Sequence, residues 1–163
     1  MSAVISDCGR YRYMLEREWM TGSGTCLFVM LNPSTADAEQ DDPTIRRCVG
    51  FAQSWGYQRL TVANVFALRS PHPKVLLEAD DPVGDDNDHW TEKLYREADL
   101  AVAAWGAFWF ARDRAADLAA SYDLHCLAVT KEGCPQHPLY IKADTKPIPF
   151  PATPEHLGGE SGG

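Results

Sequence analysis

The apolar run over residues 25–31, TCLFVML, is the feature that most constrains the fold. A continuous apolar run of this length is typical of a strand that is buried on both faces of a sheet. The run stops at Asn32-Pro33-Ser34, and an acidic loop leads to Asp42-Pro43, which suits a helix N-cap and a first helical residue. Apolar residues then recur at helical spacing until Gly56. The sequence thus predicts a buried strand, a polar loop and an amphipathic helix in succession.

The same alternation of short apolar strands and amphipathic helices continues along the chain. Residues 10–19 alternate in polarity with period two, which predicts a half-exposed edge strand with Arg12 on its polar side. The turn at residues 21–24 predicts that this strand runs antiparallel into the next one. We therefore expect an α/β three-layer sandwich, with a mostly parallel four-stranded central sheet plus an N-terminal edge strand. Further strands are predicted at residues 60–66, 100–105 and 124–129, and further helices at 74–79, 87–98 and 108–122.

The length of the chain, 163 residues, is that of one domain. We expect residues 1–150 to form a single α/β domain and residues 151–163, which end in GGESGG, to form a disordered tail. No apolar run reaches the roughly 18 residues that a membrane span needs. The sequence therefore predicts no membrane partner and a cytoplasmic location.

Charge and cysteine content limit the classes of ligand. The chain carries 15 basic and 23 acidic residues, a net charge of −8, whereas nucleic-acid backbones are bound mainly through Lys and Arg. This balance lowers the expectation of tight duplex binding and favours a small ligand.

The cysteines form no CxxC pair, which predicts reduced thiols, several of them in the core, rather than a zinc or iron–sulfur site. We expect no cofactor, and the sequence points to no known protein partner. The five cysteines are Cys8, Cys26, Cys48, Cys126 and Cys134.

Candidate site residues follow the carboxyl ends of the predicted strands, where open α/β sheets bind their ligands. Asn32 is either a turn former before Pro33 or a contact to a ligand or water. Asn64 lies inside an apolar strand, so its amide is satisfied either by a neighbouring loop or by a ligand. His137 is either a surface histidine or a catalytic residue.

Charged residues flank the acidic loop. Arg46 and Arg47 lie in the first turns of a predicted helix, where the macrodipole disfavours cations. One interpretation pairs them with Asp37, Asp41 or Asp42. The other combines them with the helix N-terminus into an anion-binding site, for instance for a phosphate. The three aspartates could also bind a divalent cation, but Asp42 is already accounted for as the cap, and we predict no metal site.

Distinctive motifs recur along the chain: MLNPSTAD, DDPTIRRC, WGY, NVFALRS, DPVG followed by ND, AWG, and HPLY. With them the chain resembles, over residues 11–149, a bacterial and phage family named domain of unknown function 1643. The same motif order is similar, more distantly, to the uracil-DNA glycosylase superfamily of parallel α/β sandwiches. Residues 30–34 stand in the place of its Gly-Ile-Asn-Pro-Gly motif, and residues 64–69 match its Asn-Val-Val-Lys-Cys-Arg strand end. Residues 137–139 stand in the place of its late His-Pro-Ser.

The superfamily resemblance implies a nucleobase-recognising enzyme that takes its target base into a pocket. It implies that Asn32 positions a water at the sugar carbon and that Asn64 reads the base edge. His137 would stabilise negative charge on the departing base. The implied catalytic residues are Asn32 and His137, and the implied substrate-binding residues are Pro33, Ser34, Asn64, Phe66, Arg69, Trp105 and Gly106. Ser34 replaces a glycine of these motifs, and Leu139 replaces a serine. The residue expected to stack on the base is Trp105 or Phe66.

The function predicted from this resemblance is hydrolysis of an N-glycosidic bond in DNA by a uracil-DNA-glycosylase-like enzyme. Two alternatives stay open. One is a non-catalytic protein that binds a nucleotide or single-stranded nucleic acid. The other is an enzyme that acts on free or modified nucleotides, which the acidic charge favours. The predicted partner is a nucleobase or nucleotide, free or within DNA, and the superfamily resemblance requires Asn32, Asn64 and His137 to converge on one pocket.

Overall fold

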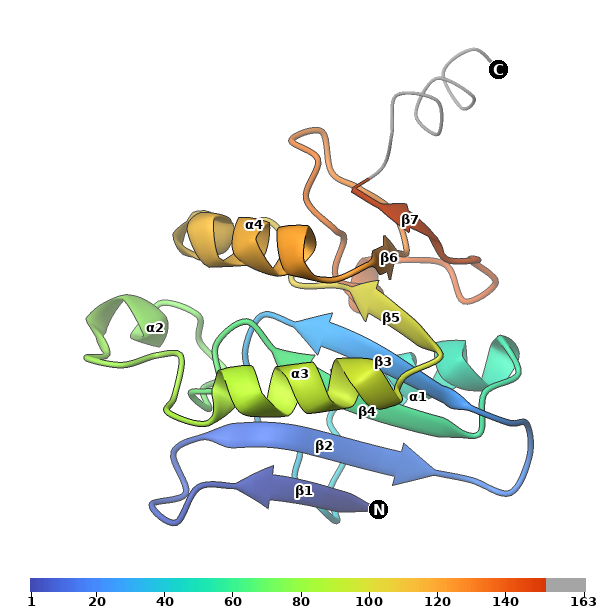
Figure 1. Ribbon diagram of the computed structural model, residues 1–163, viewed down its shortest axis with the longest axis horizontal. Helices are drawn as coiled ribbons and strands as arrows, with labels where there is room; N and C mark the ends of the chain where they lie inside the picture. Colours follow the sequence, from blue (N-terminus) through green and yellow to red (C-terminus); the bar gives the residue numbers. More distant parts are fainter. Residues whose placement is uncertain (152–163) are drawn as a thin grey trace.

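One mixed sheet of seven strands runs through the protein, whose computed structural model describes residues 1–151 (Figure 1). The strand order is β1-β2-β4-β3-β5-β6-β7. The strands are β1 (Ser2–Ile5), β2 (Arg12–Glu18), β3 (Thr25–Met30), β4 (Arg59–Asn64), β5 (Leu100–Ala103), β6 (Leu124–Cys126) and β7 (Ile148–Phe150). The central strands β4, β3, β5 and β6 pair in parallel, and the outer strands pair antiparallel to their neighbours. The predicted α/β class and parallel centre are confirmed, whereas the predicted total of five strands is wrong.

Helices cover both faces of the sheet (Figure 1). They are α1 (Pro43–Ser54), α2 (Val75–Glu78), α3 (Asn87–Glu97) and α4 (Arg112–Ser121), with 3₁₀ turns η1 (Trp109–Ala111) and η2 (Pro138–Tyr140). Along β3 the side chains alternate, so that Phe28 packs in the core beneath α1 and Leu27 in the core beneath α3 and α4. Every residue of β3 is buried, as its apolar run predicts. Among residues 1–151, no helix is both long and apolar enough to cross a membrane.

The start of α1 follows directly from local sequence. The Asp42 side chain accepts a hydrogen bond from the backbone N–H of Ile45 at 2.8 Å, and Pro43 occupies the first turn. This cap satisfies one of the backbone donors that a helix leaves unpaired at its N-terminus. The helix then buries Ile45, Cys48 and Phe51 against the sheet.

The order of the parallel strands reverses between β3 and β5. The connection through α1 leads from β3 to β4 on one side, and the connection through α4 leads from β5 to β6 on the other. In open α/β sheets, such a reversal opens a crevice at the carboxyl ends of the two strands. The residues that follow those ends here are Asn32 and Trp105, so the topology directs both toward one crevice.

Strand β2 is not the half-exposed N-terminal edge strand that its alternating sequence predicts. Its outer neighbour is β1, and its inner neighbour is β4 rather than β3. The loop over residues 32–42 covers one of its faces, since Arg12 and Arg17 bond to that loop. Arg12, predicted on the polar side, is consequently only 2% exposed.

The far edge of the sheet is formed by β7, which pairs antiparallel with β6. Its sequence is rich in proline, and Pro149 lies within it. Proline is tolerated in a strand at a sheet edge because no outer partner needs its missing N–H. The last described residue is Pro151, so the disordered tail predicted for residues 151–163 otherwise lies outside the described part of the chain.

Candidate functional site

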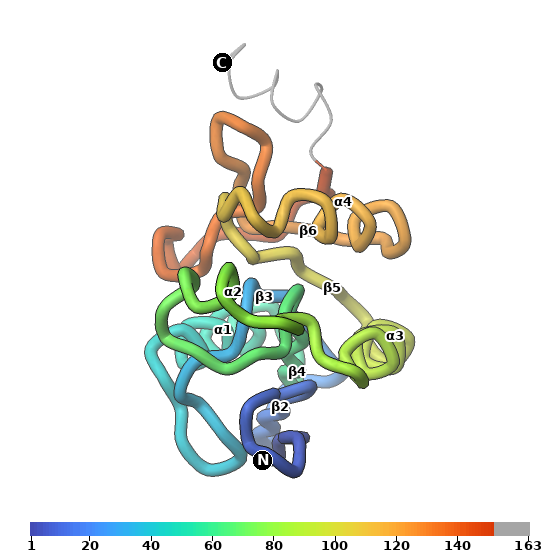
Figure 2. The backbone as a smooth tube through the Cα atoms, turned by 90° about the vertical axis from the view of Figure 1, so that its left-hand side faces the viewer, coloured from blue at the N-terminus to red at the C-terminus, as the bar shows by residue number. Residues whose placement is uncertain are grey.

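A pocket of about 350 Å³ lies at the carboxyl ends of the parallel strands. Figure 2 looks onto this end of the molecule, where the loop after β3, the segment before α2 and the loop after β6 lie around the end of β3. The pocket wall contains residues from all of these segments. Those predicted from the sequence are Asn32, Pro33, Ser34, Asn64, Trp105 and His137. The fold therefore brings Asn32, Asn64 and His137 to one pocket, although up to 105 residues separate them in sequence.

Asn64 is the last residue of β4 and the most unusual group in the pocket wall. Leu60 and Val62 precede it on the same face of the strand and pack in the core beneath α1. The side chain of Asn64 is 1% exposed, and neither its Oδ1 nor its Nδ2 has a hydrogen-bond partner within residues 1–151. An unsatisfied buried polar group costs about 1–3 kcal/mol. The sequence left two partners open for this amide, a neighbouring loop or a ligand. No loop within residues 1–151 forms a hydrogen bond with it.

Asn32 connects the end of β3 to the segment after β4. Its Nδ2 donates to three backbone carbonyl oxygens, those of Pro33 at 3.1 Å, Leu68 at 3.1 Å and Ser70 at 2.9 Å. The amide nitrogen thus shapes the loop, as the turn-forming interpretation expects. Because these bonds fix the orientation of the amide, Oδ1 is the atom of Asn32 that is left to accept a bond from a ligand or water.

His137 lies half-buried at the start of η2. Its Nδ1 accepts a hydrogen bond from the backbone N–H of Leu139 at 3.2 Å. An Nδ1 that accepts carries no proton, so the neutral ring has its proton on Nε2. Burial lowers the pKa of His137, and the nearby Asp42 carboxylate opposes that shift. At neutral pH the ring is therefore a neutral imidazole that can donate from Nε2.

The two arginines predicted to bind an anion do not line the pocket. Arg46 is exposed on α1. Arg47 donates from Nε to the carbonyl of Pro138 at 3.4 Å and from Nη2 to the carbonyl of Ile141. Its guanidinium also lies over the ring of Phe51, 5.3 Å from the centroid. Arg47 thus holds the segment that carries His137, a role different from both interpretations of the sequence.

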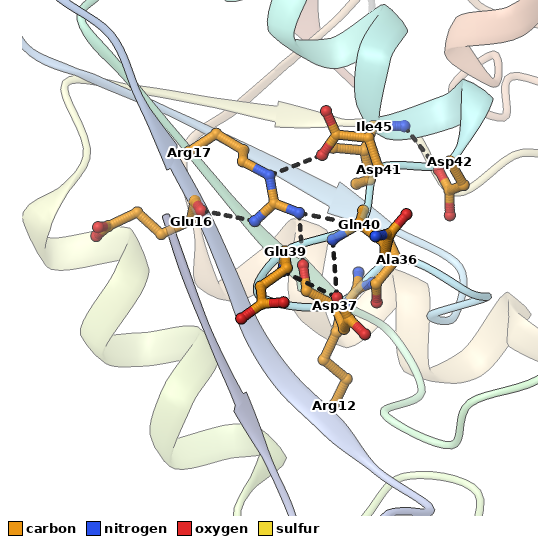
Figure 3. Close-up of polar contacts among 10 residues, drawn as sticks. All are labelled: Arg12, Glu16, Arg17, Ala36, Asp37, Glu39, Gln40, Asp41, Asp42 and Ile45. Atoms are coloured by element: carbon orange, nitrogen blue, oxygen red, sulfur yellow. Dashed lines mark hydrogen bonds and ion pairs between the residues drawn. The ribbon is translucent and has the colours of Figure 1, made fainter.

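An arginine does hold the acidic loop, but it is Arg17 of β2 and not Arg46 or Arg47 of α1 (Figure 3). The buried Arg17 donates from Nε to Asp41 at 2.7 Å and from Nη2 to the backbone carbonyls of Asp37 and Gln40. The Asp37 carboxylate accepts backbone N–H groups of its own loop, and that of Asp42 caps α1. These carboxylates therefore serve the structure of the loop. Residues 1–151 contain no cluster of three or more His, Cys, Asp or Glu side chains suited to a metal ion.

Arg12 is a pocket residue that the sequence did not single out. The alternation of residues 10–19 placed it on an exposed face, and the one local sign was a second arginine on the same strand, at position 17. Its Nη1 donates to the carbonyl of Ala36 at 2.9 Å, whereas its Nε is buried without a partner within residues 1–151. Burial lowers the pKa of Arg12 to about 10, and Asp42 opposes the shift. The guanidinium therefore remains charged at neutral pH.

Three predicted binding residues lie outside the pocket wall. Phe66 packs in the core beneath α3 and α4, with its ring 5.6 Å from that of Phe110. Arg69 lines a neighbouring hollow of about 650 Å³, and Gly106 lines an apolar groove beside α4. Of the two aromatic residues considered for stacking, only Trp105 lines the pocket.

Comparison with protein families gives one match. Residues 12–139 match the family described as protein of unknown function DUF1643. The chain belongs to this family. The predicted membership is thereby confirmed, and the span shared with DUF1643 proteins contains every residue of the pocket wall except Tyr140. No curated protein and no solved structure matches the chain, so similarity to the uracil-DNA glycosylase superfamily stays a prediction.

Proposed function

We propose that this DUF1643 protein recognises a nucleobase in the 350 Å³ pocket and hydrolyses the N-glycosidic bond that attaches the base to its sugar. The observation that carries the proposal is the buried amide of Asn64, whose two polar atoms both lack a partner in the described part of the chain. The volume falls near the lower end of the range for small-molecule sites, about 300–1,000 Å³. A pocket of this size suits a compact ligand.

Recognition of a base fits the chemistry of the Asn64 side chain. A carboxamide offers one acceptor and two donor hydrogens in a plane. The Watson–Crick edge of a base likewise places donors and acceptors side by side in a plane, and enzymes that take up an unpaired base read this edge by hydrogen bonds. Binding of a base would therefore supply the two partners that residues 1–151 do not provide.

Hydrolysis fits Asn32 and His137, which are less buried than Asn64. When the N-glycosidic bond breaks, its electron pair moves onto the base. A water adds to the anomeric carbon of the sugar, and the proton that this water loses ends on the departing base, which leaves as the neutral molecule. The Nε2–H of a neutral His137 can donate to the oxygen of the base on which negative charge develops. The Oδ1 of Asn32 can accept from the attacking water, because the rest of that amide is fixed by backbone carbonyls.

A second candidate function is an enzyme that acts on free or modified nucleotides. Its support is the net charge of −8, which disfavours a long polyanion, together with the carboxylate of Asp42 in the pocket wall. The recognition of the base by Asn64 is common to both candidates. They differ in whether the substrate is a polymer.

The test is release of free base from uracil- and hypoxanthine-containing oligonucleotides, and from the corresponding nucleosides and nucleotides. We expect release that falls by at least about 100-fold in Asn32→Ala and His137→Ala, the range for loss of one positioned catalytic group. His89→Ala, which removes an exposed histidine of α3, is the matched control and should retain activity. Absence of release from every substrate, or full activity in Asn64→Ala, would contradict the proposal.

A further inference from the structure

We infer that Arg12 binds a phosphate group of the ligand, so that the pocket takes a nucleotide in preference to a free base or nucleoside. The inference rests on the proposed recognition of a nucleobase and narrows it to a phosphorylated ligand. Its basis is a buried cation in the pocket wall whose hydrogen-bonding capacity the protein leaves largely unused.

Within residues 1–151 the guanidinium of Arg12 forms no direct ion pair, and the nearby Asp42 carboxylate acts on it through its charge without a hydrogen bond. The residue is 2% exposed, and the one partner of its guanidinium within residues 1–151 is a neutral group, the carbonyl of Ala36. No carboxylate lies within ion-pair distance of it in that part of the chain. Burying a charge is unfavourable unless the charge is paired and hydrogen-bonded. An anionic ligand group would supply the missing pair.

Arg17 shows how the same strand satisfies a buried arginine that has a purely structural role. Its Nε pairs with the Asp41 carboxylate, its Nη1 donates to the carbonyl of Glu16, and its Nη2 donates to two further carbonyls of the acidic loop (Figure 3). All three nitrogens are engaged. Arg12 lies five positions earlier, and among the described residues its guanidinium engages a partner through Nη1 alone. Nε and Nη2 form one edge of the planar guanidinium. The contrast with Arg17 indicates that this edge of Arg12 is available to bind a ligand.

That edge matches a phosphate. Two adjacent N–H donors of a guanidinium bind two oxygens of a phosphate in parallel. Ser34 and Thr44 line the same pocket, and neither side-chain hydroxyl forms a hydrogen bond within residues 1–151. Both can donate to phosphate oxygens. Asp42 adds a carboxylate to the wall, but it accepts from Ile45 at the start of α1.

The phosphate can come from a mononucleotide or from a polynucleotide strand. A neighbouring hollow bears on this choice, because it shares Ser34, Ser70 and Pro71 with the pocket and adds Arg10 and Arg69. A strand would carry further phosphates past these two arginines, whereas a mononucleotide would leave them unused. Dependence of binding on Arg10 and Arg69 therefore distinguishes the two sources.

The test is calorimetric titration of the full chain with matched pairs of nucleosides and nucleoside 5′-monophosphates, and with inorganic phosphate. We expect the monophosphate of the preferred base to bind at least about ten-fold more tightly than its nucleoside, about 1.4 kcal/mol. Arg12→Gln should abolish this preference by weakening the binding of the monophosphate to the level of the nucleoside. Arg46→Gln, which removes an exposed cation of α1 outside the pocket, should keep it. A preference that is absent in the wild type or survives in Arg12→Gln overturns the inference.

A more conservative variant covers the case in which Arg12→Gln does not fold. Arg12→Lys keeps the charge and loses the forked geometry, so the phosphate preference should shrink but not vanish. A single-stranded oligonucleotide titrated into Arg10→Gln and Arg69→Gln identifies the source of the phosphate. Weakened binding of the oligonucleotide with unchanged binding of the monophosphate assigns the site to a polymer, and unchanged binding of both assigns it to a mononucleotide.

The outcomes also separate this inference from the proposed function. If inorganic phosphate binds in an Arg12-dependent manner while no base, nucleoside or nucleotide binds through Asn64, the phosphate site stands and the nucleobase proposal fails. If base is recognised through Asn64 with equal affinity for nucleoside and nucleotide, the proposed function stands and the phosphate inference fails.

Discussion

Asn87 holds the backbone of Asn64 in place, while no group within residues 1–151 holds the Asn64 side chain. The Nδ2 of Asn87 donates to the carbonyl of Asn64 at 3.0 Å and to that of Val65 at 3.2 Å. Asn87 is fully buried at the start of α3, on the opposite side of the sheet from α1. The fold thus fixes the end of β4 from one face and leaves an amide unpaired on the other, which is the arrangement of a supported ligand contact.

The first prediction follows from this asymmetry. Asn64→Leu replaces an unsatisfied buried amide by an apolar group of similar size next to Leu60 and Val62. We expect the free energy of unfolding to rise by about 1–2 kcal/mol, because the desolvation cost of the amide is removed, and binding of nucleobases to be lost. Urea denaturation with parallel titration calorimetry measures both quantities. A destabilised Asn64→Leu variant would mean that the native amide has a partner.

A second prediction compares two arginines of the sheet. Arg17→Met removes the ion pair with Asp41 and leaves two loop carbonyls without their donor, so we expect a loss of about 2–3 kcal/mol in unfolding free energy. Arg59→Met removes a solvent-exposed pair with Glu18, at 3.3 Å, and should cost less than about 1 kcal/mol. Equal effects of the two substitutions on the denaturation midpoint would contradict the assigned role of Arg17 as the anchor of the acidic loop.

Cysteine reactivity gives a third prediction. Cys8 is exposed, and its bond to the Ser6 hydroxyl lowers the pKa of its thiol. Burial raises the pKa of Cys26 and Cys48, and raises that of Cys126 to about 11. In native protein at pH 7.5, iodoacetamide should therefore modify Cys8 and spare these three, which become reactive on denaturation. Peptide mass spectrometry reports the sites, and native labelling of Cys26 or Cys48 would contradict the buried core.

The elements that the sequence predicts well are those with local signals. The apolar run of β3 and the cap and proline of α1 define both elements within about 30 residues, and the structure has them as predicted. The edge strands lack such signals, since β1 and β7 are short and β7 contains proline. The alternation in β2 does not reveal its burial, because β1 is too short to be predicted and the loop over residues 32–42 covers β2 only in the folded chain.

The candidate site was predicted in part for the same reason. Asn32, Asn64 and Trp105 follow strand ends, so the rule for open α/β sheets brings them together without knowledge of side-chain contacts. Arg12 could not be found in this way, because it begins an antiparallel strand that the rule does not cover. Phe66 departs from the prediction because residues that follow a strand can turn back into the core, as its packing on Phe110 shows.

The last prediction concerns the dependence of stability on pH. Burial lowers the pKa of His137 below its unfolded value of 6.5, so the folded state disfavours the protonated ring, although the Asp42 carboxylate opposes part of the shift. Below pH 6.5 the unfolded chain binds more protons at this residue than the folded one. Its contribution to stability is therefore fully present above pH 6.5 and is lost as the pH falls through the folded pKa. Between pH 7.5 and 5, wild-type stability should decline more steeply than that of His137→Gln, measured by urea denaturation at each pH. Equal slopes would show that the ring is solvated, and would remove the basis for treating it as a neutral donor in the pocket.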